Sequence, residues 1–146
     1  MTSTTNTKKN LSVVYSFEGR WEEPLRRGEI CVFFRKRRPI KLPGKVFFYI
    51  GVPVKAIIGF ATVKDIKEVS LEDAKLLRGE GAITENELIK YIGLNGRVHA
   101  IRIGNLDLFG RPRTLSDLNA EFGFNPPQSF SIVDESFEDV LLGSAE

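Results

Sequence analysis

The chain has 146 residues, of which 42% are hydrophobic and 27% are charged, and this is the composition of one globular domain. A single cysteine and a single histidine exclude an intramolecular disulfide, a cysteine-based zinc site and the usual multi-histidine metal centres. No apolar run approaches the roughly 18 residues that span a bilayer, and residues 1–10 lack the apolar core of an export signal. We therefore expect a cytoplasmic protein without membrane segment, metal or cofactor, with a disordered tail over residues 1–10 and one domain over residues 11–146.

The order of apolar and capping residues predicts a mainly β fold with short inserted helices. Alternating β-branched and aromatic residues indicate strands, and Ser or Thr followed three residues later by an acid indicates the start of a helix. We expect strands over 11–16, 30–36, 45–51, 54–69 with a bend at Gly59, 97–104 continuing toward 109, and 129–133. We expect helices over 17–27, 70–78, 84–92, from 114 onward, and over 134–142.

Two short links constrain how these strands are arranged. The links over residues 38–44 and 51–54 are too short for parallel crossovers, which predicts antiparallel pairing of the strands that they join. The chain shows no internal repeat. The order fits the α+β class, as a small mixed β-barrel with inserted short helices, better than a doubly wound parallel sheet.

Positive charge is concentrated in the first half of the chain. Residues 1–69 carry 14 Lys and Arg against 6 Asp and Glu, a net charge of +8, whereas residues 70–146 carry 7 against 13, a net charge of −6. Six cations without an intervening acid fall between positions 35 and 45, here called the basic segment: Arg35, Lys36, Arg37, Arg38, Lys41 and Lys45. Phosphate groups would relieve the repulsion within the basic segment. The alternative is a solvated strand edge that discourages pairing with other chains.

Several residues near the basic segment have the chemistry to contact a nucleobase. Tyr49 and Trp21 combine a large ring with a polar edge, and we expect them to stack on a base. Gln128 and Ser129 follow two prolines in a loop and can donate and accept hydrogen bonds at a base edge. We expect the remaining two notable side chains to be structural, with Cys31 buried as a small apolar residue and His99 hydrogen-bonded within the sheet.

Residues 25–39 (Leu-Arg-Arg-Gly-Glu-Ile-Cys-Val-Phe-Phe-Arg-Lys-Arg-Arg-Pro) resemble the helix–glycine–strand signature of ASCH domains, members of the PUA-like superfamily. Residues 53–59, 78–81 and 126–130 are similar to later segments of such sequences. The resemblance implies a pseudo-barrel whose cleft is lined by the basic end of a strand. It also implies binding of RNA or a modified nucleotide, or in some relatives the hydrolysis of acylated nucleosides or of RNA.

The resemblance also identifies where catalytic residues would lie. Ile30 stands where the family has the lysine of a Gly-x-Lys turn, and Phe33 stands where some members have a threonine, so neither position supplies a nucleophile or proton carrier. Glu80 remains as a candidate general acid or base, although it also fits a solvated carboxylate at a helix end. We therefore expect an RNA- or nucleotide-binding domain. The alternatives are an ASCH-type nucleoside amidohydrolase or ribonuclease, and a protein-interaction module that uses the acids at positions 134–139.

Overall fold

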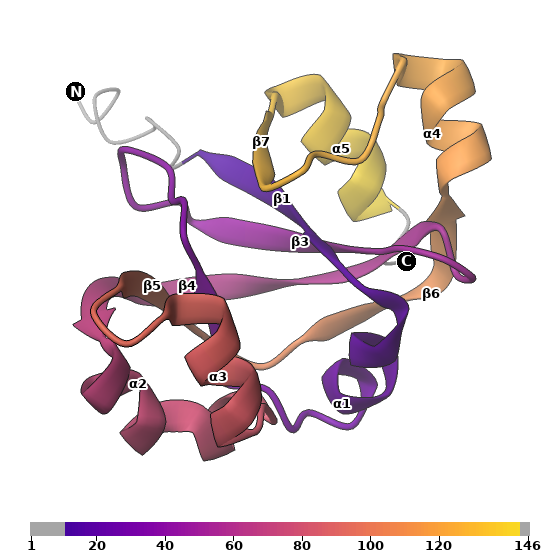
Figure 1. Ribbon diagram of the computed structural model, residues 1–146. Coiled ribbons are helices and arrows are strands. Elements are labelled where there is room, and N and C mark those ends of the chain that lie inside the picture. Colours follow the sequence, from indigo (N-terminus) through magenta and orange to yellow (C-terminus); the bar gives the residue numbers. More distant parts are fainter. Residues whose placement is uncertain (1–10, 144–146) are drawn as a thin grey trace, which may run out of the picture.

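A computed structural model describes residues 11–143, so the tail expected over residues 1–10 lies outside the described residues (Figure 1). The strands within this range are β1 (Ser12–Phe17), β2 (Val32–Arg35), β3 (Lys45–Ile50), β4 (Ala56–Ser70), β5 (Arg97–Ile103), β6 (Asp107–Thr114) and β7 (Phe130–Val133). The α-helices are α1 (Glu22–Arg26), α2 (Leu71–Leu77), α3 (Glu85–Ile92), α4 (Leu115–Phe122) and α5 (Glu135–Gly143), and two 3-10 helices are η2 (Gly19–Trp21) and η3 (Arg78–Gly81). Within residues 11–143 no helix is long and apolar enough to cross a membrane.

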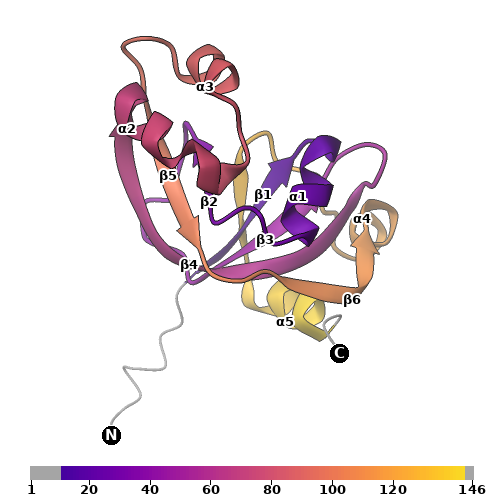
Figure 2. The same cartoon turned by 90° about the horizontal axis from the view of Figure 1, so that it is seen from below.

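The strands form one mixed sheet in the order β2-β5-β4-β3-β1-β7, and β6 pairs with β4 outside this path. Every pairing is antiparallel except that of β1 with β3. Figure 2 shows β4 as one long curved strand, whose first half pairs with β3 and β6 and whose second half pairs with β5. Among the described residues no pairing joins the two end strands, β2 and β7, so a closed barrel is not confirmed.

The curvature of β4 has a local cause at Gly59. The register of β4 against β6 shifts between Ile57 and Gly59, and a side-chain carbon added at Gly59 would clash with the carbonyl oxygen of Asp107. A glycine is therefore required where β6 crosses closely, in agreement with the bend expected there.

The strand connections differ from the sequence prediction in two places. The link over residues 38–44 joins β2 to β3, but these strands do not pair, because β2 lies beside β5 and β3 lies between β1 and β4. A short link constrains the pairing of two strands only if they are neighbours in the sheet. The prediction wrongly assumed that the strands joined by residues 38–44 are neighbours. The expected strand running past residue 104 is two strands, β5 and β6, separated at residues 104–106.

The apolar side chains form three clusters because neighbouring residues of a strand face opposite sides. Phe33 and Phe48 lie in the cluster enclosed by the curved sheet. Phe47 lies on the opposite side, in a cluster covered by α4 and α5. Phe34 belongs to a third cluster beneath α2 and α3. We call residues 71–92, which hold α2, η3 and α3, the helical lobe; it lies across the sheet from α4 and α5 (Figure 1).

The helices of the lobe begin where the sequence predicts them. The Thr84 hydroxyl accepts a hydrogen bond from the Glu87 backbone N–H, and the Glu87 carboxylate accepts one from the Thr84 backbone N–H, at 3.2 and 2.9 Å. Ser70 accepts similarly from the Asp73 backbone N–H at 3.3 Å. These bonds, which are reciprocal only at Thr84, satisfy backbone groups that the first helical turn leaves free. They also fix the Glu87 carboxylate at the surface of the lobe.

Candidate functional site

A cavity of about 330 Å³ lies where the helical lobe meets the sheet. A smaller hollow of about 30 Å³ shares Trp21, Phe34, Arg35 and Ile83 with this cavity, so the two form one cleft. We call it the Arg35 cleft. The β1–α1 connection supplies Glu18, Arg20 and Trp21, the lobe supplies Ile83, Glu87 and Tyr91, and the end of β2 supplies Phe34 and Arg35. A cavity of this size is at the lower end of the range for ligand pockets.

Arg35 carries a positive charge in the Arg35 cleft and forms no ion pair with a carboxylate of the described residues. Its guanidinium donates to the carbonyl oxygens of Ser16 at 3.0 Å and Phe34 at 2.9 Å. It also lies over the rings of Phe17 and Phe33, 4.4 and 5.2 Å from their centres. Among the residues that the structure describes, no carboxylate oxygen lies within 4.0 Å of an Arg35 nitrogen. Burial lowers the pKa of this guanidinium below its ordinary value because the charged form loses water, and this effect outweighs the opposite influence of Tyr91, Tyr15 and Glu18.

Hydrogen bonds attach the start of the basic segment to this cleft. The Lys36 backbone N–H donates to the Tyr91 hydroxyl at 3.0 Å, and the Lys36 ammonium lies 5.0 Å from the centre of the Tyr91 ring. The Tyr15 hydroxyl donates to the carbonyl oxygen of Arg37 at 2.9 Å. Burial raises the pKa of the Tyr15 phenol well above its ordinary value, although Arg35 acts in the opposite direction. Tyr15 therefore stays protonated and holds the chain that leaves β2.

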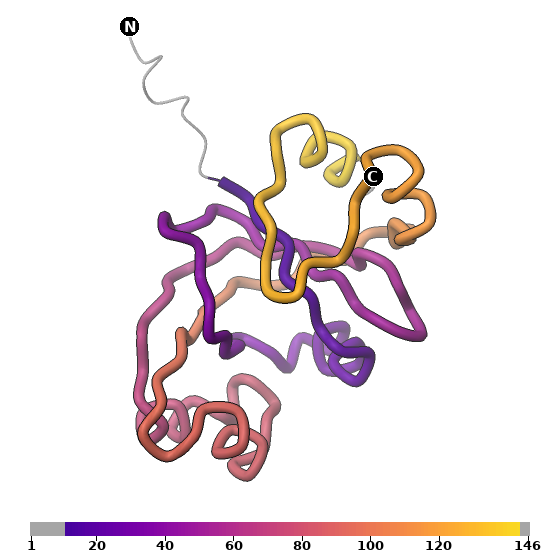
Figure 3. The backbone as a smooth tube through the Cα atoms, turned by 45° about the horizontal axis from the view of Figure 1, so that its top comes forward, coloured from indigo at the N-terminus to yellow at the C-terminus, as the bar shows by residue number. Residues whose placement is uncertain are grey.

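The rest of the basic segment runs away from the Arg35 cleft. Figure 3 shows the connection from β2 to β3 running from the helical lobe to the start of β3. Arg37 and Lys41 are exposed along it, whereas Arg38 donates to the carbonyl oxygen of Pro39 at 2.9 Å. Lys45 lies 3.3 Å from Glu138 of α5, which neutralises it. The structure thus brings Arg35 and Lys36 of the predicted set to the cleft, and leaves the others beside it or elsewhere.

Trp21 is one wall of the Arg35 cleft, as its predicted role requires. The guanidinium of Arg20 lies 4.1 Å from the centre of the Trp21 ring. The same guanidinium is 2.6 Å from the Glu87 carboxylate and 3.7 Å from that of Glu18. The hydrogen bond from the Thr84 backbone is the main reason that the pKa of Glu87 lies below its ordinary value, and Arg20 adds to the effect. Arg20 therefore links the β1–α1 connection to the helical lobe at this cleft.

The structure corrects the prediction for Tyr49. This residue is 4% exposed and packs against Phe124, in the cluster under α4 and α5, on the side of the sheet away from the Arg35 cleft. Its ring is used in the core, and burial raises its pKa. No free face remains for a base. The alternation along β3 was predicted, but helices cover the face that would otherwise meet solvent.

Three other predicted residues lie outside the lining of the Arg35 cleft. Gln128 is exposed and Ser129 is partly buried in the loop before β7, and this loop is anchored by a 2.7 Å hydrogen bond from the Ser16 hydroxyl to the carbonyl oxygen of Pro127. Glu80 accepts a 3.0 Å hydrogen bond from Arg102, which holds its carboxylate in an ion pair. The loop nevertheless adjoins the cleft through Ser16, which lines it.

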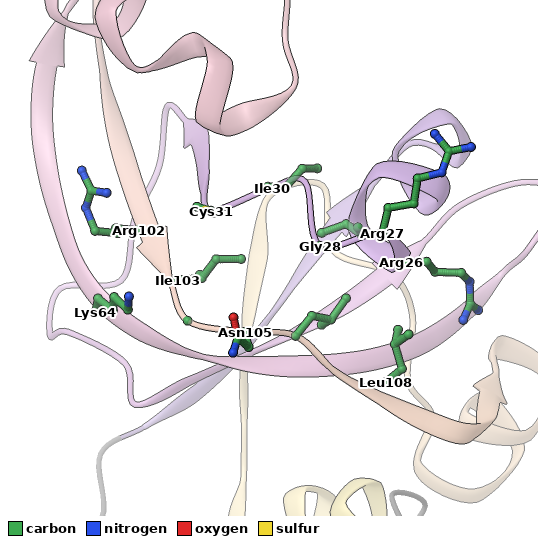
Figure 4. A pocket seen from close by; sticks show the side chains of 13 residues that line it. Arg26, Arg27, Gly28, Ile30, Cys31, Lys64, Arg102, Ile103, Asn105 and Leu108 are labelled. Carbon is green, nitrogen blue, oxygen red and sulfur yellow. The ribbon is translucent and has the colours of Figure 1, made fainter.

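A second cavity of about 290 Å³ lies between α1 and the strands β4 and β5, and Figure 4 shows Arg26 and Arg27 on one side of it and Lys64 and Arg102 on the other. Three of these cations have carboxylate partners, since Arg26 pairs with Glu22, Arg27 with Glu23 and Arg102 with Glu80, at 2.9, 3.2 and 3.0 Å. Lys64 is the cation of this cavity without a carboxylate partner among the described residues, so this cavity and the Arg35 cleft each hold one unpaired cation. Ile30, which stands at the family's lysine position, lines both.

Cys31 and His99 differ from expectation. Cys31 is exposed at the rim of the second cavity and is not a core residue. The Nδ1 atom of His99 is buried without a hydrogen-bond partner among the described residues, so the expected hydrogen bond at that atom is not formed.

A third cavity of about 520 Å³ contains Lys55 and Asn119 near the start of α4. Within residues 11–143 no group of three or more His, Cys, Asp or Glu could hold a metal ion.

Sequence reasoning missed three residues of the Arg35 cleft. Glu87 was expected only as the acid that follows Thr84 at a helix start, and Arg20 was assigned no role within the helix expected over residues 17–27. Tyr91 precedes the buried Ile92 in α3, and its position in the helical repeat does not predict that it is buried or that it has a functional role. These residues come together because the lobe between β4 and β5 folds over the end of β2, and no local sequence signal reports that contact.

Comparison with known proteins defines the fold. No protein-family model matches the sequence, and no curated protein matches it. The structure is similar to that of ASCH from Zymomonas mobilis, with a TM-score of 0.83 and 24% identity, over 90% of this chain and 94% of that one. The N-terminal domain of Staphylothermus marinus McrB matches with a TM-score of 0.60 and 14% identity, over 90% and 93% of the chains. The N-terminal domain of Thermococcus gammatolerans McrB, bound to m5C DNA, matches with a TM-score of 0.50 and 15% identity, over 94% and 100%. The chain therefore has the same mixed α+β fold as these ASCH and McrB structures.

Proposed function

We propose that the chain is an RNA- or nucleotide-binding domain whose Arg35 cleft receives one nucleotide unit. The observation that carries this proposal is the Arg35 guanidinium, which lies in the Arg35 cleft without a carboxylate partner among the described residues. An unpaired, partly buried charge costs free energy, and an anionic or carbonyl group of a ligand would remove that cost. A guanidinium has five N–H donors in a planar fork, and two of the Arg35 bonds are made to backbone carbonyls, so donors remain for a ligand.

The aromatic side chains of the Arg35 cleft support a nucleobase as the group that enters. Trp21 and Tyr91 both line it, from the β1–α1 connection and the helical lobe respectively. Each ring has a cation at one face, Arg20 at Trp21 and Lys36 at Tyr91. A base stacked on such a ring gains about 1–3 kcal/mol.

The basic segment supports a longer strand as the natural partner. Lys36, Arg37 and Lys41 have no carboxylate partner among the described residues, and the segment leaves the Arg35 cleft at Lys36. Cations in a row beside a base pocket suit the sugar–phosphate backbone on either side of the bound nucleotide. The similarity to a McrB domain bound to m5C DNA gives independent support for nucleic acid as the class of ligand.

The side chains of the Arg35 cleft favour binding over hydrolysis. Its two hydroxyl groups are both engaged, since the Ser16 hydroxyl donates to the Pro127 carbonyl and the Tyr91 hydroxyl accepts from the Lys36 N–H. The carboxylate of Glu80 is held by Arg102 outside the lining of the cleft. We therefore propose binding without turnover.

The test is an electrophoretic shift of single-stranded and structured RNA at about 50 mM and about 200 mM salt. We expect binding that weakens steeply with salt. Arg37→Ala should lower the slope of log K against log salt by about 1. Arg111→Ala is the matched control, because Arg111 is an exposed arginine on β6, across the molecule from the helical lobe (Figure 2). The proposal is contradicted if binding does not depend on the salt concentration, or if the two variants have equal slopes of log K against log salt.

A further inference from the structure

The ion pair at the Arg35 cleft joins a movable residue to a fixed one. Glu87 is held by Thr84, whose backbone N–H and hydroxyl both donate to one of its carboxylate oxygens, at 2.9 and 3.1 Å. Its other oxygen lies 2.6 Å from Arg20. Arg20 has no comparable anchor, because its remaining contacts are the Trp21 ring and a 3.7 Å approach to the exposed Glu18. When the pair breaks, Glu87 stays where it is and Arg20 moves.

The ion pair between Arg20 and Glu87 is weak enough for a ligand phosphate to replace Glu87. The Arg20 side chain is 50% exposed and that of Glu87 is 34% exposed. Exposed ion pairs of this kind shift an equilibrium by no more than about fivefold. A phosphate offers the guanidinium a charge-assisted bidentate contact that is stronger than this pair.

We propose that Arg20 acts as a phosphate clamp, which binds the phosphate of a bound nucleotide and which pairs with Glu87 in the free protein. In the free protein Arg20 bridges Trp21 and Glu87; in the complex its guanidinium leaves Glu87 for the phosphate of the nucleotide whose base lies in the Arg35 cleft. This inference rests on the proposed function, and it adds that the site prefers a nucleotide to the matching nucleoside. It also makes Glu87 a competitor of the ligand, so that removing the Glu87 charge strengthens binding.

Three substitutions separate these roles. Glu87→Gln removes the charge but keeps the helix cap, because glutamine also serves at the third position of a capping box. Arg20→Gln removes the clamp. Glu23→Gln is the control, since it removes the same charge from an exposed pair, 3.2 Å from Arg27, outside the lining of the cleft.

The first measurement needs no ligand. Trp21 is the only tryptophan, so its fluorescence reports on the Arg35 cleft alone. We expect Arg20→Gln and Glu87→Gln to raise the acrylamide quenching constant, because the guanidinium no longer shields the ring, and Glu23→Gln to leave it unchanged. Equal quenching constants in all three variants would show that the Arg20 guanidinium does not cover the Trp21 ring.

The second measurement is the affinity for each of the four ribonucleoside 5′-monophosphates and for the four nucleosides, by fluorescence titration. For the monophosphates we expect Glu87→Gln to bind about three- to fivefold tighter than Glu23→Gln, and Arg20→Gln to bind about tenfold weaker than the wild type. For the nucleosides, Arg20→Gln should bind no more weakly than the wild type.

The outcomes distinguish the two proposals. If the wild type binds no monophosphate, no nucleoside and no RNA, the proposed function fails and the clamp fails with it. If the wild type binds but Glu87→Gln equals Glu23→Gln, or Arg20→Gln weakens nucleosides and monophosphates alike, only the clamp is overturned.

Discussion

Replacement of Arg35 by methionine separates a functional charge from a structural one, because methionine keeps a long, unbranched apolar stem. In the folded protein the guanidinium donates two hydrogen bonds, to Ser16 and Phe34, which contribute about 1 kcal/mol each. Its ring contacts with Phe17 and Phe33 add about 1–2 kcal/mol. Removing an unpaired charge from water costs several kcal/mol. These opposing contributions nearly cancel.

We therefore expect Arg35→Met to change the free energy of unfolding by less than about 1 kcal/mol. The measurement is urea unfolding followed by circular dichroism, in which the midpoint changes little and the m-value stays constant. Binding should respond very differently. Loss of two charge-assisted hydrogen bonds of about 1.5 kcal/mol each weakens nucleotide or RNA binding about 100-fold. Arg35→Lys keeps the charge without the planar fork, and it should lie between the two, about tenfold weaker than the wild type.

The opposite result would refute this reasoning. A loss of about 3 kcal/mol or more in unfolding free energy is the effect of breaking a buried, compensated charge. If Arg35→Met shows such a loss while Arg35→Lys binds RNA as the wild type does, Arg35 serves the fold, and the Arg35 cleft must bind through other groups.

Three further outcomes follow from the geometry. Gly59→Ala should lower the free energy of unfolding by about 1–3 kcal/mol, because the added carbon meets the backbone of β6, whereas Gly110→Ala, with no atom within 4 Å, should not; equal urea midpoints would contradict this. Tyr15→Phe should cost about 1 kcal/mol in urea unfolding through the lost bond to Arg37. The raised pKa of Tyr15 means that the folded state keeps a proton which the unfolded chain loses near pH 10, so its contribution is complete below that pH and falls as the pH rises. Tyr15→Phe should therefore flatten the alkaline loss of stability, and an unchanged pH profile would contradict this.

Local features of the fold were predictable because their causes lie within a few residues. The caps at Ser70 and Thr84 depend on a hydroxyl and an N–H three positions later, and both are formed. Asp134 accepts from the Phe137 backbone N–H at 2.8 Å at the start of α5 in the same way. The pairing of β1 with β3 was not predictable, since it depends on which of several apolar strands fits beside another.

In the candidate site too, residues with a local signal were predictable and residues placed by tertiary contacts were not. Trp21 and Arg35 were predicted from residue chemistry alone, and both line the Arg35 cleft. Tyr49 has the same chemistry but was wrongly assigned, because both faces of β3 are buried and α4 and α5 decide the second one. Glu87 and Tyr91 reach the cleft only through the placement of the lobe, which is a tertiary contact.

The pairing of β1 with β7 has a consequence for biosynthesis. Ser12 lies opposite Val133, so the first strand of the described chain gains its outer neighbour only after nearly all of the domain has been translated. Until then β1 has an open edge of backbone amides and carbonyls, which is the feature that recruits other nascent chains into aggregates. A chain truncated before β7 would thus be prone to intermolecular strand addition at β1.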